Sequence, residues 1–170
     1  ANGFVTFGCF NNPSKVNDVL LGRWAELLRA APDSRLLLKG GAFGNDELRA
    51  HVHGIMAAHG IARERVLIEG PVGHKTLLET YNRIDIALDP HPYNGTITTC
   101  DTLWMGAPLV TLATPRRWTH SPFTSHFRSA ALTSHVSELS ARASAHRSCP
   151  VFRLASNYAL CIWTEFLEPL

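Results

Sequence analysis

"RLLLKG" at residues 35–40 decides the fold of this 170-residue chain. Three consecutive leucines stand between Arg35 and the closing pair Lys39 and Gly40, with no polar residue alternating among them. A short apolar run of this kind indicates a strand that is buried on both faces, which is typical of parallel sheets covered by helices. The stretch therefore predicts an α/β fold.

Strand-like and helical stretches alternate on both sides of this run. The other expected strands are 4–10, 65–70, 84–89 and 108–112. The expected helices are 15–31, 45–59, 74–82 and 98–106. In the first of them the apolar residues recur at steps of three and four, and Asn45 or Asp46 is expected to cap the second. This alternation predicts a Rossmann-like parallel sheet with helices on both faces, which occupies residues 1–112.

Residues 113–170 have a different composition. They are rich in Ser, His and Arg, and they contain six Arg against three Glu. The alternation of strands and helices fades here, so we interpret this part as a divergent carboxyl-terminal extension. Apolar residues return near the end, which predicts a packing helix at 151–168.

Composition and charge exclude several classes of protein. A formal net charge of +2 is not typical of nucleic-acid binding, and no apolar run approaches the roughly 20 residues that span a bilayer. The cysteines form no CxxC pair, which favours a reduced, cytoplasmic setting; they are Cys9, Cys100, Cys149 and Cys161. Because the chain begins with Ala1 rather than Met, we expect it to be a piece of a longer protein.

No metal site is expected. His51 and His53 are two residues apart on a predicted helix, so they do not share a face. The histidines beyond residue 113 have no recognisable ligand spacing.

The carboxyl ends of the strands are where open parallel sheets bind their ligands. Four loops are expected there: 11–14, 40–45, 70–75 and 89–97. In the last of them, Asn94 and Gly95 give a strong turn signal. Thr96, Thr98 and Thr99 follow at the start of a predicted helix, whose unpaired amides bind phosphate readily. The plain alternative is a capped helix with a threonine-rich first turn.

Charged residues near these loops fit a nucleotide. Lys15 and Lys75 each follow a predicted strand, where a diphosphate needs cations. Asp101 should not face a phosphate, but its carboxylate suits the two hydroxyl groups of a ribose. Gly73 allows the backbone to approach a base edge closely. The alternative for each lysine is an ordinary solvated side chain.

Three segments together resemble the carboxyl-terminal catalytic lobe of protein O-GlcNAc transferases, including the bacterial and SPINDLY-type members. They are "FGCFNNPSKV" (7–16), "RVLIEGPVGHKTLLETYNRIDIALDPHPYNGT" (65–96) and "TTCDTLWMGAPLVTL" (98–112). The likeness covers residues 3–112. It implies one lobe of a GT-B glycosyltransferase that needs no metal or other cofactor and transfers N-acetylglucosamine from UDP-GlcNAc to Ser or Thr of proteins.

The resemblance also assigns residues. It implies that Asn12 and Lys15 contact the diphosphate, with Lys15 stabilising charge on the leaving group as the catalytic residue. Gly73 and Lys75 stand at the base and ribose contacts, and Asp101 at the ribose hydroxyls. The run assigned to substrate binding before and into the helix is Asn94, Gly95, Thr96, Ile97, Thr98 and Thr99.

Three positions depart from the family pattern. Asn12 falls where the animal enzymes have a glutamine. Leu78 falls where the animal enzymes have a histidine stacked on uracil, and Ile97 falls where a threonine is expected. The expected partners are a nucleotide-sugar donor, a protein acceptor, and the amino-terminal lobe and TPR repeats of the full-length protein, with no nucleic acid and no membrane. The alternatives are a protein O-fucosyltransferase that uses GDP-fucose, a non-catalytic nucleotide-binding remnant or interaction domain, and a GT-B enzyme acting on a small molecule or lipid.

Overall fold

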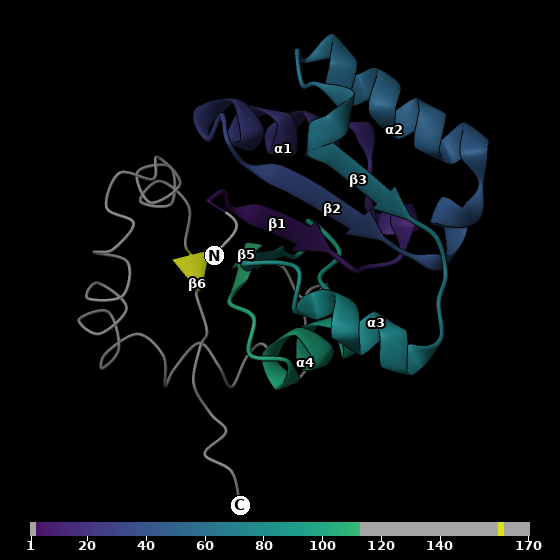
Figure 1. The fold of residues 1–170 in the computed structure, drawn as a ribbon, viewed down its shortest axis with the longest axis vertical. Coiled ribbons are helices and arrows are strands. Elements are labelled where there is room, and N and C mark those ends of the chain that lie inside the picture. Colours follow the sequence, from purple (N-terminus) through teal and green to yellow (C-terminus); the bar gives the residue numbers. More distant parts are fainter. Residues whose placement is uncertain (1–2, 113–159, 162–170) are drawn as a thin grey trace, which may run out of the picture.

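The computed structural model describes residues 3–112 and 160–161. Its six strands are β1 (Thr6–Cys9), β2 (Arg35–Lys39), β3 (Val66–Glu69), β4 (Ile86–Leu88), β5 (Leu109–Leu112) and β6 (Leu160–Cys161). They form one sheet in the order β3-β2-β1-β4-β5-β6 (Figure 1). The first five are parallel, and β6 runs antiparallel to β5. The predicted parallel α/β sheet is confirmed.

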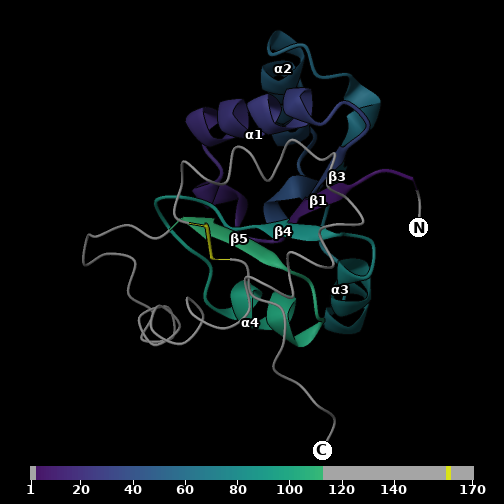
Figure 2. The same ribbon diagram turned by 90° about the vertical axis from the view of Figure 1, so that its left-hand side faces the viewer.

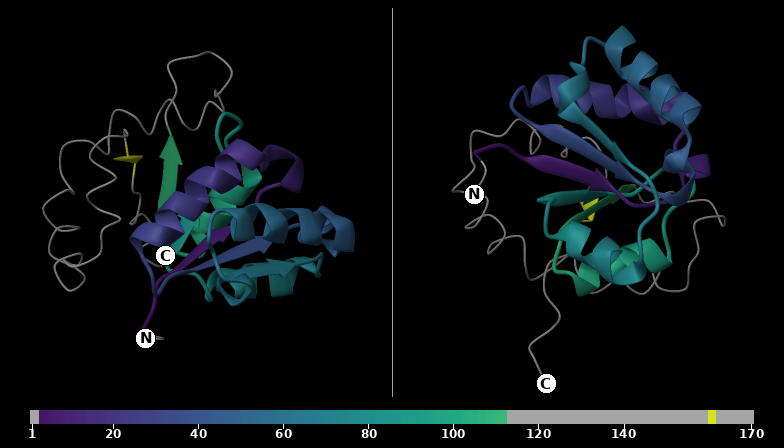
Figure 3. Two further views of the ribbon diagram at one scale, coloured as in Figure 1. Left: turned by 90° about the horizontal axis from the view of Figure 1, so that it is seen from above. Right: turned by 45° about the vertical axis from the view of Figure 1, so that its right-hand side comes forward.

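Helices cover both faces of this sheet. They are α1 (Asp18–Ala30), α2 (Asp46–Ala58), α3 (His74–Tyr81) and α4 (Ile97–Trp104). Short 3-10 turns are η1 (Pro13–Lys15), η2 (Gly41–Gly44) and η3 (Arg63–Arg65). Figure 2 shows α1 and α2 on one face and α3 and α4 on the other, and the right-hand view of Figure 3 shows the same layering.

The leucines of β2 show why the sheet is layered in this way. Leu36, Leu37 and Leu38 are all fully buried. Leu36 and Leu38 belong to the core that contains Trp24 of α1 and Met56 of α2. Leu37 belongs to the core on the opposite face, under α3 and α4. An apolar run without alternation is therefore needed because each face carries its own core.

Some element boundaries differ from the prediction. The first helix begins at Asp18 rather than at residue 15, because Pro13–Lys15 form a separate turn. Asn17 then caps α1 by accepting a hydrogen bond from the Leu20 amide at 2.9 Å. Asn45, not Asp46, caps α2 by accepting from the Glu47 and Leu48 amides.

The carboxyl-terminal extension lies outside the described residues, except for Leu160–Cys161. These two residues form β6, so they are strand where a helix over 151–168 was expected. In the part of the chain that the structure describes, none of the helices has the length and apolarity needed to cross a membrane.

The strand order creates a switch point between β1 and β4. From β1 the chain moves outward to β2 and β3, then returns to place β4 on the other side of β1. Loops that follow two such neighbouring strands diverge, and open α/β sheets bind ligands in the crevice between them. Of the four candidate loops, this order selects those after β1 and β4.

Candidate functional site

Hydrogen bonds join the loop after β1 to the loop after β4 and to the start of α4. Lys15 donates from Nζ to the backbone oxygen of Asn94 at 2.9 Å. The hydroxyl of Thr98 donates to Oδ1 of Asn11, also at 2.9 Å. The structure therefore brings the predicted residues Lys15, Asn94 and Thr98 together at the switch point, with the amino end of α4 beside them.

Asp89, directly after β4, anchors these loops through the hydrogen bonds of its carboxylate. It is buried, with 8% of its surface exposed. Its carboxylate accepts hydrogen bonds from the Gly95 amide at 2.7 Å, Asn94 Nδ2 at 2.9 Å and the Thr111 hydroxyl at 2.8 Å. Nδ2 of Asn11 donates to it at 3.4 Å. One carboxylate thus connects the ends of three neighbouring strands.

Burial raises the pKa of Asp89 above its ordinary value, although hydrogen bonds from Gly95, Thr111 and Asn94 and the charge of Lys15 oppose the rise. Asp89, Asn11 and Thr111 were not among the residues that sequence analysis selected. The sequence "IDIALD" already indicated a role for Asp89, because a carboxylate at the end of a buried strand needs hydrogen-bond donors from elsewhere in the fold.

Gly95 is required by close approach. An ideal Cβ at this position would lie 2.8 Å from Asn11 Oδ1 and nearer still to the Thr98 hydroxyl oxygen. Asn-Gly is a turn signal because both residues tolerate positive φ, but Gly95 is not among the positive-φ glycines of the described chain. The physical reason is instead that the side chains of Asn11, Thr98 and Thr99 occupy the space that a side chain at Gly95 would need.

The amino ends of α3 and α4 lack side-chain caps. α1 and α2 each begin after an asparagine whose side chain accepts an amide hydrogen bond. Among the described helices, α3 follows Gly73 and α4 follows Thr96 without such a bond. The first amides of a helix have no partner inside it, so those of α4, next to Lys15, can bind a phosphate group.

The hydroxyl and the carbonyl of Thr98 are both engaged within the fold. Its hydroxyl proton is directed to Asn11, and its role toward a ligand stays a prediction. Behind it, the Tyr81 hydroxyl donates to the Thr98 carbonyl at 3.4 Å, and Tyr81 stacks on Phe10 with ring centroids 3.9 Å apart. The end of α3 therefore supports the beginning of α4.

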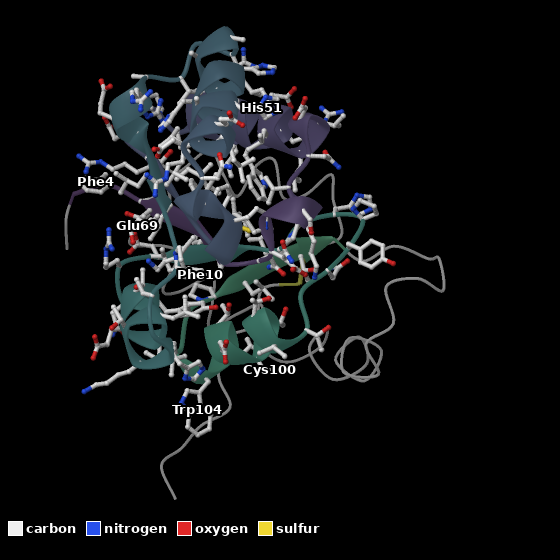
Figure 4. The ribbon with its side chains drawn as sticks, turned by 90° about the vertical axis from the view of Figure 1, so that its right-hand side faces the viewer. Phe4, Phe10, His51, Glu69, Cys100 and Trp104 are labelled. Atoms are coloured by element: carbon white, nitrogen blue, oxygen red, sulfur yellow. The ribbon has the colours of Figure 1, made fainter. Side chains whose placement is uncertain are left out.

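The other predicted residues of this loop lie around the cluster. Asn12 is exposed, and its side chain accepts from the Ser14 amide at 3.1 Å. Thr96 is exposed, Ile97 is 75% exposed, and Thr99 and Asp101 are half-buried. Figure 4 shows the later residues Cys100 and Trp104 on the outer part of α4. The roles of these residues toward a ligand stay predictions.

Gly73 and Lys75 stand apart from the cluster. Both are exposed at the start of α3, and a Cβ at Gly73 would meet nothing within 4 Å. In residues 3–112, hydrogen bonds do not join either of them to Lys15, Asn94 or Thr98. Their assignment to a base and ribose also stays a prediction.

Potential metal ligands are dispersed in this part of the chain. Among the described residues, three or more His, Cys, Asp or Glu side chains nowhere form a group that would hold a metal ion. His51, considered above as a ligand, instead lies 3.0 Å from the Asp18 carboxylate.

The chain is thus a Rossmann-like α/β lobe with a lysine and an uncapped helix start at its switch point. Comparison with known proteins identifies its family. The model of Glycosyl transferase family 41 matches residues 1–147, and the chain belongs to this family. The resemblance to protein O-GlcNAc transferases is thereby confirmed.

Several relatives illustrate the likeness. The chain is 43% identical over 112 residues to a probable UDP-N-acetylglucosamine–peptide N-acetylglucosaminyltransferase SPINDLY of Petunia hybrida, covering 65% of this chain and 12% of that protein. It is 42% identical over 116 residues to the SPINDLY protein of Oryza sativa subsp. japonica, covering 66% and 12%.

A solved structure agrees with these sequences. It is a mutant of the Thermobaculum terrenum O-GlcNAc transferase, with a TM-score of 0.70 and 37% identity over 75% of this chain and 24% of that one. The chain thus spans about an eighth of the curated relatives that it matches, 12% of each SPINDLY protein compared above.

Proposed function

We propose that this chain is the nucleotide-sugar-binding lobe of a protein O-glycosyltransferase that transfers N-acetylglucosamine from UDP-GlcNAc to Ser or Thr. The observation that carries the proposal is the placement of the Lys15 ammonium beside the uncapped start of α4 at the switch point. The names of the family 41 relatives support the donor and the peptide acceptor.

The chemistry follows from charge. When an acceptor hydroxyl oxygen attacks the anomeric carbon, the bond to the diphosphate breaks and negative charge grows on the leaving UDP. Lys15 and the first amides of α4 would stabilise that charge from fixed positions. In this proposal they take the part that a metal ion has in other transferases, and the reaction uses no cofactor.

Other residues would hold the nucleoside. Asp101 would accept hydrogen bonds from the two ribose hydroxyls, while Gly73 and Lys75 would contact the base and ribose from the start of α3. The remaining half of the cleft, the group that takes the acceptor proton, and TPR repeats that select proteins would belong to the longer protein. The free thiols of Cys9 and Cys100 suit the cytoplasmic setting that we propose.

Titration of the purified 170-residue chain with UDP and with GDP tests this function. UDP binding at millimolar or lower concentration supports it. Binding of GDP alone would favour a GDP-fucose donor, and binding of neither would overturn the assignment of the site.

Substitutions test the roles of individual residues. Lys15→Ala and Asp101→Ala should each weaken UDP binding by about 1–3 kcal/mol, the usual cost of removing one partner of a buried hydrogen bond. Arg29→Ala is the matched control for charge, because it removes one cation from the last turn of α1, which leads into the opposite edge of the sheet. A Lys15→Ala chain that binds UDP like the parent would contradict the proposed role.

A further inference from the structure

We propose that Asp89 is a positioning residue that fixes the phosphate-binding loop and, through Asn94, the ammonium of Lys15. This inference rests on the proposed function, because it assigns a role within that same site. Asp89 is buried below the loop, so it acts through other residues and does not contact the ligand itself.

Both carboxylate oxygens are engaged. Oδ1 accepts from the Gly95 amide and, at longer distance, from Asn11 Nδ2. Oδ2 accepts from Asn94 Nδ2 and the Thr111 hydroxyl. An ionised carboxylate suits this place because it only accepts, whereas an asparagine would turn an NH₂ group toward at least one of these donors.

Asn94 carries the effect of Asp89 to Lys15. The Asn94 side chain is bound to the carboxylate, and it also donates to the Thr111 hydroxyl. With its side chain held on both, Asn94 presents its backbone oxygen to Lys15 Nζ at 2.9 Å. The position of the cation therefore depends on a carboxylate that it does not touch.

Asn11 carries the effect to α4. Because Asp89 can only accept, Asn11 must direct its NH₂ group toward it, which leaves Oδ1 for the Thr98 hydroxyl. Thr98 stands in the first turn of α4, so this bond sets where that turn lies relative to β1. Lys15 and the α4 amides thus have a common anchor.

The test compares Asp89→Asn with a matched control in the same strand region. Asp85→Asn is the control, because the Asp85 carboxylate also accepts a backbone hydrogen bond, from Thr6 at 2.8 Å, but just before β4 at the opposite edge of the sheet. Each 170-residue chain is titrated with UDP and with uridine by NMR. The difference between the two ligands isolates the diphosphate.

We expect Asp89→Asn to weaken UDP binding by about tenfold or more, equivalent to about 1.4 kcal/mol, with uridine binding unchanged. Asp85→Asn should change neither. Equal UDP affinity in Asp89→Asn and the parent overturns the inference. An equal loss for UDP and uridine also overturns it, because it would mean a general defect of the fold.

A ligand-free measurement separates this inference from the proposed function. Amide hydrogen exchange at Gly95 should accelerate in Asp89→Asn, since the amide loses a charged acceptor, and unchanged exchange would refute the anchoring. If the parent binds neither UDP nor GDP, the proposed function fails, and exchange at Gly95 still decides whether Asp89 organises the loop.

A second variant covers the case in which Asp89→Asn does not fold. Thr111→Val removes one donor to the same carboxylate and suits a strand. It should reduce the preference for UDP over uridine in the same direction, by a smaller factor. A preference equal to that of the parent would refute the inference.

Discussion

Gly95→Ala should destabilise the whole lobe by disrupting its switch-point contacts. The added Cβ would lie 2.8 Å from Asn11 Oδ1 and closer to the Thr98 hydroxyl oxygen, and Thr99 Oγ1 would be 3.0 Å away. Real Cβ atoms essentially never approach another atom within 3.0 Å. Since the neighbours come at once from the loop after β1 and from α4, the chain must move.

The magnitude follows from the bonds at risk. Forcing an extra methyl group into packed space costs about 1–3 kcal/mol. Movement of the loop also stretches the charge-assisted bond from the Gly95 amide to Asp89 and the bond from Thr98 to Asn11, whose loss costs about 1–3 kcal/mol. Because both costs are partly relieved by relaxation, we expect a loss of about 2–4 kcal/mol in the free energy of unfolding.

Urea unfolding followed by far-UV circular dichroism measures this free energy. The control is Gly54→Ala in α2, where a new Cβ would meet nothing within 4 Å. In a helix interior this change should stabilise by about 0.5–1 kcal/mol. A loss below about 1 kcal/mol in Gly95→Ala would refute the idea that the loop is held tightly by these contacts.

Further predictions concern charge and thiol chemistry. Partial burial raises the pKa of Glu69, but hydrogen bonds from Arg83 and Lys39 lower it more, so its value lies below the ordinary 4.5. Ionised Glu69 therefore contributes its full stabilisation above pH 4.5, and this stabilisation is lost as the pH falls through the lower pKa of the folded state. Arg83→Gln should lower the free energy of unfolding at pH 7, and its difference from the parent should shrink on acidification below pH 4.5; a constant difference would contradict the ion pair. Burial raises the pKa of Cys9 to about 12, so peptide mapping after alkylation of the native chain should find Cys100 modified much faster than Cys9; equal rates would show that β1 is not protected.

Local sequence signals predicted the layered sheet well. Burial of the β2 leucines, and of the α1 stripe that contains Trp24, can be recognised from the spacing of apolar residues a few positions apart in the sequence. The start of α1 was misplaced because Val16 continues the apolar spacing of the helix toward its amino end. In the fold, Pro13 begins a separate turn, and the helix starts after Asn17, whose side-chain oxygen accepts a hydrogen bond from the Leu20 amide.

Long-range contacts explain what the sequence did not reveal about the site. Asp89 meets Asn11 from 78 positions away and Thr111 from 22. Periodicity contains no information about such pairs, because they depend on the order of strands in the sheet. Lys15 and Thr98, which the sequence singled out, do lie in this cluster, because one follows β1 and the other begins α4. Their roles toward a ligand stay predictions. The orientation of the Asn94 side chain could not be predicted, because it depends on where Asp89 lies in the fold.

Because α3 and α4 lack side-chain caps, the free energy of unfolding should depend on whether a ligand is bound at their amino ends. Helix ends that lack a cap leave the folded state less stable than it would be with one. Any ligand that satisfies those amides binds the folded chain and not the unfolded one, so it stabilises the fold in proportion to the logarithm of its concentration. The lobe's resistance to unfolding is then set partly by how much ligand surrounds it, and least when it is empty.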